Sequence, residues 1–166
     1  MRTRASGASG PRLFLVVGLV VAVLAIVTAG VSFRLYLLDA EARRITAVRF
    51  PGGEVAVEVA VSAAERQAGL AGREGLRPDS GMLFAYRDTG PRRFTMAGMR
   101  FPLDIITISG GGEVTGVQTR RPGDGAFDTP SARYVLEVAA GWAASHGVIP
   151  GLPAVLIYRN AEGGSP

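Results

Sequence analysis

Cysteine and lysine are both absent from this 166-residue chain, and histidine occurs once, as His146. Without cysteine there are no disulfides, no thiol nucleophile, no zinc–thiolate or iron–sulfur site and no lipid attached through sulfur. Without lysine there is no phosphate-loop lysine and no Schiff base. His146 lies in GWAASHGVIPG, which predicts a surface turn or short helix, and we expect a solvated rather than a catalytic histidine.

The net charge of +4 is distributed unevenly along the chain. Residues 1–44 contain six arginines and two carboxylates, whereas residues 45–166 contain twelve of each. The folded part is therefore neutral and lacks the basic face that nucleic-acid binding requires. The ligand spacing of a calcium loop is absent around Asp124 and Asp128, and the glycines at 110–112 lack the helix of a phosphate loop. We expect no nucleic-acid partner, no metal and no cofactor.

A long uncharged run occupies residues 13–33. A helix of this length spans roughly 32 Å, which matches a hydrocarbon core of about 30 Å. The run predicts a transmembrane anchor; the alternative is a cleaved secretory signal ending near Val27-Thr28-Ala29. Arginines flank the run equally, but a long domain translocates largely regardless of its charge. We therefore expect a single-pass protein of the cytoplasmic membrane, with the C-terminal domain extracytoplasmic.

The remaining segments predict one β-rich domain. We expect a disordered basic leader at 1–12, a juxtamembrane stalk at 34–44, the domain at 45–160 and a flexible tail at 161–166. In the run 54–61, valine alternates with glutamate or alanine, which is typical of a half-buried strand. Ser62 and Glu65 form the S-x-x-E pattern that begins a helix. About seven or eight short strands and one or two short helices indicate a mainly β, α+β domain, either a compact barrel or a sandwich.

Four charged residues could form a polar site. Asp104 has apolar neighbours in the strand FPLDIITIS, and Glu137 has the same surroundings in YVLEV. A buried carboxylate must be paired, or its pKa rises until it is neutral, and Arg66 and Arg73 are plausible partners. Together these groups could act as general acid and base, or bind a sugar or a cation. Alternatively they tie loops to strand ends, because structural ion pairs are common.

Two further residues could line a ligand cleft. Met96 lies close to several arginines, and Trp142 could be a platform on which a sugar ring stacks. The alternatives are that Met96 belongs to the core and that Trp142 covers one end of it.

Several motifs in order resemble the bacterial and archaeal family catalogued as domain of unknown function 192. These are Arg66 with Gly69-Leu70, Arg73, Gly81-Met82-Leu83-Phe84, Phe94 and Met96, Pro102-Leu103-Asp104-Ile105-Ile106, Pro122, and Tyr134-Val135-Leu136-Glu137 with Gly141. The resemblance implies a compact β-rich fold, commonly with a signal or anchor segment, and no known activity. Departures occur where the family usually has Trp (here Thr95), Met (Ala71) and a polar triplet (Ala97-Gly98-Met99). If that patch is the family's ligand surface, it is altered in this chain.

The function that these observations favour is a membrane-anchored binding or accessory module for a cell-envelope ligand or a membrane-protein partner. The alternative is a carboxylate-dependent hydrolase or related enzyme that uses Asp104 and Glu137, with Arg66 as the positioning charge. Convergence of these three groups in an open pocket favours the enzyme, whereas burial with paired partners favours a structural role.

Overall fold

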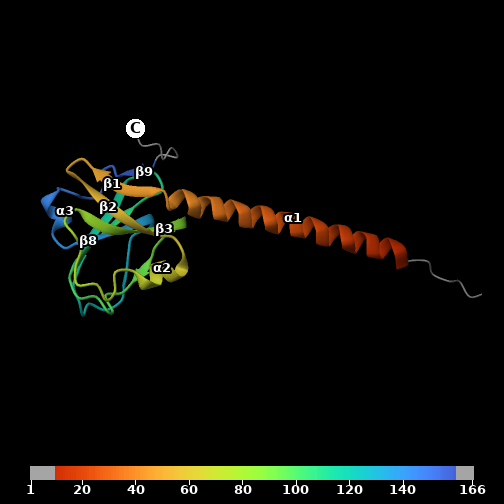
Figure 1. Ribbon diagram of the computed structural model, residues 1–166, viewed down its shortest axis with the longest axis horizontal. Helices are drawn as coiled ribbons and strands as arrows, with labels where there is room; N and C mark the ends of the chain where they lie inside the picture. The colour runs from red at the N-terminus through yellow and green to blue at the C-terminus, as the bar shows by residue number, and fades with distance from the viewer. Residues whose placement is uncertain (1–9, 160–166) are drawn as a thin grey trace, which may run out of the picture. The chain divides into compact units, whose positions relative to one another are not determined.

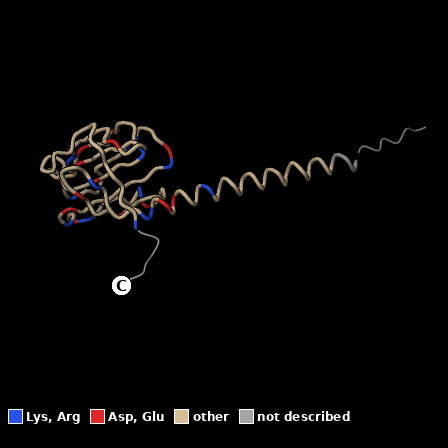
Figure 2. The backbone as a smooth tube through the Cα atoms, turned by 90° about the horizontal axis from the view of Figure 1, so that it is seen from above, with Lys and Arg blue, Asp and Glu red and all other residues tan. Residues whose placement is uncertain are grey.

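The computed structural model describes the backbone of residues 10–159 and the side chains of residues 14–159. The expected tail, and the expected leader up to residue 9, lie outside the described residues. The chain divides into two compact units after Leu37. Helix α1 (Gly10–Ala42) includes the apolar run, and the mean hydropathy of an 18-residue stretch within Phe14–Ala42 reaches 2.9. Figure 2 shows how few charged residues it carries compared with the domain.

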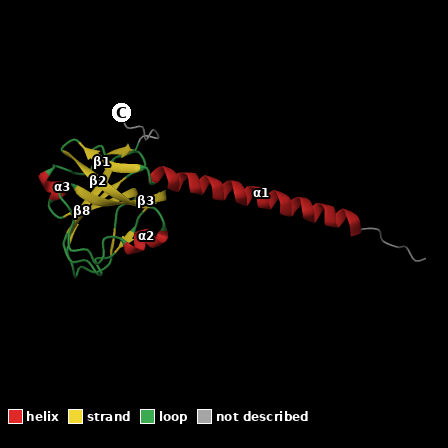
Figure 3. Cartoon of the chain, viewed as in Figure 1, coloured by secondary structure: helices red, strands yellow, loops and turns green. Residues whose placement is uncertain are grey.

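The second unit contains nine strands and two short helices among its described residues (Figures 1 and 3). The elements in chain order are β1 (Ile45–Phe50), β2 (Gly53–Ala60), α2 (Ala63–Ala68), β3 (Ser80–Gly90), β4 (Arg93–Phe94), β5 (Leu103–Ile108), β6 (Val114–Arg120), β7 (Phe127–Asp128), β8 (Ala132–Ala139), α3 (Trp142–Ser145) and β9 (Val155–Tyr158). The mainly β, α+β prediction is confirmed.

Seven strands form one sheet in the order β6-β5-β8-β3-β2-β1-β9, and β4 pairs with β7 separately. Most neighbours are antiparallel, but β2 and β3 run parallel because α2 carries the chain back between them. The edge strands β6 and β9 do not pair with each other, although the segments before them are joined by an isolated bridge between Glu113 and Pro153 and by a few backbone hydrogen bonds. The closed-barrel alternative is therefore wrong and a sandwich-like arrangement holds.

Local sequence patterns account for several elements. The capping box at α2 is complete, because the Ser62 hydroxyl accepts from the Glu65 N–H and the Glu65 carboxylate accepts from the Ser62 N–H. The β5–β6 hairpin turns at 109–113, where three consecutive glycines lie. In β2, Val55 is fully buried but Val57 and Val59 are only half-buried. The alternation is therefore correct, while the depth of burial varies along the strand.

The sheet is apolar on both faces. One core gathers around Leu83, Ile106, Leu136 and Val138, and helix α3 adds Ala143. The other contains Phe84, Ile105 and Val135, and it is covered by Leu70, which follows α2, and by Met96 and Phe127. Strand β5 is buried at all six positions. Adjacent residues of β5 and β8 therefore point into different cores.

Candidate functional site

A pocket of about 310 Å³ opens on the second of these faces, beside α2. We call it the Glu137 pocket. Its walls come from α2 and the turn that follows it, from β3, from β4 with the segment after it, and from β8. The lining residues are Arg66, Gln67, Ala68, Gly69, Leu70, Ala71, Phe84, Tyr86, Arg93, Phe94, Thr95, Ala97, Met99 and Glu137.

The end of α2 shapes one wall of the pocket. Gly69 terminates the helix with φ of 49°, a left-handed conformation that favours glycine. A Cβ at Gly69 would lie 3.5 Å from the Phe84 ring, an ordinary van der Waals contact, so the positive φ rather than lack of space favours glycine here. Leu70 then enters the core and is 1% exposed. The helix end is thereby fixed against the sheet.

Glu137 is the buried carboxyl of this pocket. In β8 it pairs with Met82 of β3 and Ile105 of β5, so all three side chains share one face. The residue is only 6% exposed, and among the described residues we find no hydrogen bond or ion pair to its carboxyl. Burial raises the pKa of Glu137 from 4.5 to about 8. At neutral pH the group is therefore mostly a neutral acid that can donate a hydrogen bond.

Aromatic rings and arginines surround this acid. The Phe84 and Phe94 rings meet edge to face with centroids 5.2 Å apart. Tyr86 lies between two guanidiniums, with Arg66 at 4.7 Å and Arg92 at 4.0 Å from its centroid. Burial is the main reason that the pKa of the Tyr86 phenol is raised. Apolar rings and cationic groups thus line the same small space.

Arg66 reaches this pocket, and within the described part of the chain its guanidinium has no carboxylate partner. Its guanidinium donates to the carbonyl oxygens of Val61 and Ala85, the latter at 3.3 Å. It therefore ties the start of α2 to β3 while its cation lies over the Tyr86 ring. Of the four charged candidates, the structure brings Arg66 and Glu137 to one pocket.

Asp104 has a structural environment on the other face of the sheet. It is 2% exposed and pairs with Val138, which belongs to the opposite core. Its carboxylate accepts from the Thr119 hydroxyl at 2.7 Å and from the backbone N–H groups of Gly141 and Ala143, each at 2.9 Å. The prediction of an arginine partner is wrong, because these three donors satisfy the carboxylate instead and hold the start of α3.

Arg73 and Met96 do not line the Glu137 pocket. Arg73 donates to both carboxylate oxygens of Glu58 at 2.7 Å, which lowers the pKa of Glu58. Met96 is 2% exposed and packs in the second core rather than lining the pocket.

Trp142 donates its indole N–H to Asp79 and stacks on His146 with ring centroids 4.1 Å apart. It covers one end of the first core. His146 is consequently half-buried rather than freely solvated, which corrects the sequence-based expectation.

Sequence reasoning missed the aromatic walls, Phe84, Tyr86 and Phe94. One signal could have found the pocket: the departures at Ala71, Thr95, Ala97 and Met99 all lie on its lining. Within the described residues, no three His, Asp or Glu side chains gather into a group that could hold a metal ion. The pocket therefore offers one acid, aromatic surface and arginines.

The fold and the site together define a β-rich domain that carries one buried acid in a pocket on one face of its sheet. A family model, DUF192, described as "Uncharacterized ACR", matches residues 46–154, and the chain belongs to that family. No curated protein matches the chain. Both the resemblance of its motifs and the family model thus lead to an uncharacterised family.

Two solved structures are similar to this chain. One is described as a "putative transcription regulator" from Sinorhizobium meliloti 1021; it is 29% identical, and the match covers 66% of this chain and 90% of that one, with a TM-score of 0.61. The other is a protein of unknown function from Novosphingobium aromaticivorans DSM 12444; it is 26% identical, with coverage of 66% and 81% and a TM-score of 0.60.

Replacement of Asp104 by Asn should destabilise the domain. The amide can keep its oxygen on the backbone N–H groups of Gly141 and Ala143 only by turning its N–H₂ group toward the Thr119 hydroxyl. It also loses the charge that strengthens all three bonds, so the free energy of unfolding should fall by about 1 to 3 kcal/mol. Chemical denaturation of the full-length chain in detergent measures this. Asp128→Asn, which removes only a solvent-exposed pair with Arg93, should change stability by less than about 1 kcal/mol. Equal stability of Asp104→Asn and wild type would contradict the structural role.

Proposed function

We propose that this protein is a membrane-anchored, extracytoplasmic binding module, and that the Glu137 pocket is its ligand site. The observation that carries the proposal is the buried carboxyl of Glu137 on the lining of an open pocket, with no partner found among the described residues. A carboxyl whose pKa is raised by burial and that lies on the lining of an open pocket is typical of a functional site. A ligand that bonds to Glu137 would provide the missing partner.

The chemistry of the lining suggests the class of ligand. The protonated Glu137 can donate to a carbonyl or hydroxyl oxygen, and the Phe84 and Phe94 rings offer an apolar surface. A cationic ligand is disfavoured by Arg66 and Arg93, which also line the pocket. A small neutral molecule with a carbonyl group, such as an N-acetylated envelope sugar, combines these features.

The anchor supplies the location. Phe14–Ala42 is long and apolar enough to cross a membrane, a property that a signal sequence near the N-terminus shares. We infer that it is retained and that the domain is exported. Alkaline phosphatase fused after Arg159 should be active and remain in the membrane fraction. A soluble fusion would contradict the anchor, and an inactive, membrane-bound one would contradict the orientation.

A hydrolase is the second candidate, and one observation favours it: a carboxyl with a pKa of about 8 exchanges protons readily near neutral pH. That hypothesis requires the carboxyl groups of Asp104 and Glu137 to act on the same substrate. Asp104 and Glu137 belong to opposite faces of the sheet, and three donors occupy Asp104. A pocket with one acid agrees better with binding than with two-carboxylate hydrolysis.

Binding of small neutral amides and N-acetylated sugars to the full-length chain in detergent should be detectable by NMR. Amide signals from 67–71 and 93–99 should shift saturably. Affinity should fall as the pH rises above about 8, because Glu137 then loses the proton that it donates.

Two tryptophan substitutions at alanine positions of α2 localise the site. Ala68→Trp places an indole on the pocket lining and should abolish the shifts, whereas Ala63→Trp, on the same helix but outside the lining, should retain them. Absence of binding by the whole panel, or equal binding to both variants, would contradict the proposal. Turnover of a sugar that Glu137→Gln abolishes would favour the hydrolase.

A further inference from the structure

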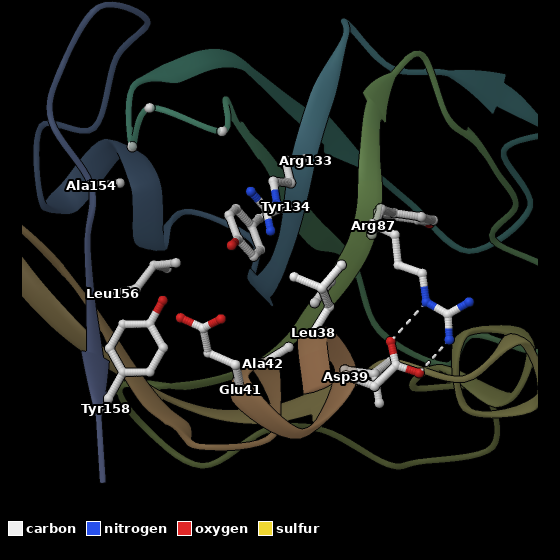
Figure 4. Close-up of a pocket in the computed structure, with 16 residues that line it drawn as sticks. Leu38, Asp39, Glu41, Ala42, Arg87, Arg133, Tyr134, Ala154, Leu156 and Tyr158 are labelled. Carbon is white, nitrogen blue, oxygen red and sulfur yellow. Dashed lines mark hydrogen bonds and ion pairs between the residues drawn. The ribbon is translucent and has the colours of Figure 1, made fainter. Parts of the chain in front are cut away.

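A second, larger pocket lies within the compact unit that begins at Leu38, and we call it the stalk pocket (Figure 4). Its volume is about 540 Å³. The last residues of α1 form one wall, and β3, the β5–β6 turn, β8 and β9 form the others. None of the candidate residues predicted from the sequence lies on its lining.

One pair of charges on the lining is already satisfied. Arg87 donates to both carboxylate oxygens of Asp39, at 2.9 and 2.6 Å, in a bidentate ion pair. This pair holds the end of α1 to β3 at one side of the pocket. It leaves Asp39 and Arg87 unavailable as primary contacts for a ligand.

Two other charged side chains on the lining, Glu41 and Arg133, form no such ion pair among the described residues. Among the described residues we find no ion pair or hydrogen bond to the Glu41 carboxylate, which is exposed. The Nε atom of Arg133 is buried without a hydrogen-bond partner in the same part of the chain. In Figure 4 the Glu41 carboxylate and the Tyr158 hydroxyl point toward one space, which Tyr134 and Arg133 face from β8. An acid and a guanidinium thus share the lining, and neither has an ion-pair partner among the described residues.

Two tyrosines, Tyr134 and Tyr158, share the lining with Glu41 and Arg133. Tyr134 is 9% exposed, and the Arg133 guanidinium lies 5.6 Å from its ring centroid. Burial raises the pKa of the Tyr158 phenol, and Tyr134 and Glu41 raise it further, which places these three groups in one electrostatic neighbourhood. Aromatic faces beside a carboxylate are suited to an ammonium group.

The chain connection limits how far this pocket can lie from a membrane. Phe33 ends the uncharged run and Leu38 lines the pocket. Five residues span at most about 18 Å even when fully extended. If the anchor is inserted, the pocket therefore lies within reach of the lipid headgroups, whatever the orientation of the domain.

We propose that the stalk pocket binds the headgroup of a zwitterionic phospholipid, with its ammonium at Glu41 and the tyrosines and its phosphodiester at Arg133. A phosphate alone would meet the Glu41 and Asp39 carboxylates, and an amine alone would meet Arg133. A ligand that carries both charges a few bonds apart satisfies both ends. Access to lipid rests on the proposed anchor, but recognition of the headgroup does not.

The test uses the full-length chain in a maltoside detergent, which contains no phosphate. Glycerophosphoethanolamine is titrated and binding is followed by amide NMR shifts at 110–112 and 154–158. Saturable binding is expected, with glycerol 3-phosphate and ethanolamine each at least about tenfold weaker. Arg133→Gln and Glu41→Gln should each weaken binding about tenfold, a loss equivalent to one charge-assisted contact.

Matched controls are Arg121→Gln and Glu74→Gln, two exposed positions outside the pocket, which should bind as the wild type does. Glu41 is exposed, so its variant should fold normally even if Arg133→Gln does not. Absence of binding, equal binding of glycerol 3-phosphate, or unchanged affinity in Glu41→Gln would overturn the inference. Because detergent micelles replace the bilayer, an inactive or soluble phosphatase fusion would contradict the proposed location without affecting this result.

Discussion

The fold depends on a central strand that is buried on both faces. Strand β8 pairs with β3 on one side and β5 on the other, so its side chains alternate between two cores. Leu136 and Val138 enter one core, and Val135 enters the other together with Glu137. A one-residue slip of this register would move every one of these side chains to the wrong face. The position of Glu137 is therefore determined by the pairing that holds the sheet together.

The two buried carboxyls, Asp104 and Glu137, are stabilised in the fold in opposite ways. Asp104 is stabilised by a hydroxyl and two backbone N–H groups, and these bonds attach α3 to the sheet. Glu137 has no comparable donors among the described residues, and its burial is accommodated by a raised pKa rather than by pairing. A group held in this way lowers stability when it ionises. Folded proteins commonly retain such a cost at a functional site, which is why we assign the ligand site to Glu137 and a structural role to Asp104.

Local sequence signals predicted the elements better than their assembly. The Ser62–Glu65 capping box and the family motifs each depend on residues close together in the chain, and each is confirmed. The separation of Asp104 from Glu137 depends on the register between β5 and β8, which composition cannot supply. The parallel pairing of β2 with β3 is equally non-local. The walls of the Glu137 pocket come from four separate segments, so no single motif could reveal them.

The pH dependence of stability in Glu137→Gln, compared with the wild type, tests the central claim most directly. The native state holds the Glu137 proton up to a pH of about 8, whereas the unfolded chain releases it near 4.5. Between these values the native state binds more protons, so wild-type stability falls with rising pH by up to about 1.4 kcal/mol per pH unit. Glutamine has no such proton, and the other titrating groups cancel in the difference. The stability of the variant relative to wild type should therefore rise steadily from pH 5 to pH 8, and a difference independent of pH would contradict the account.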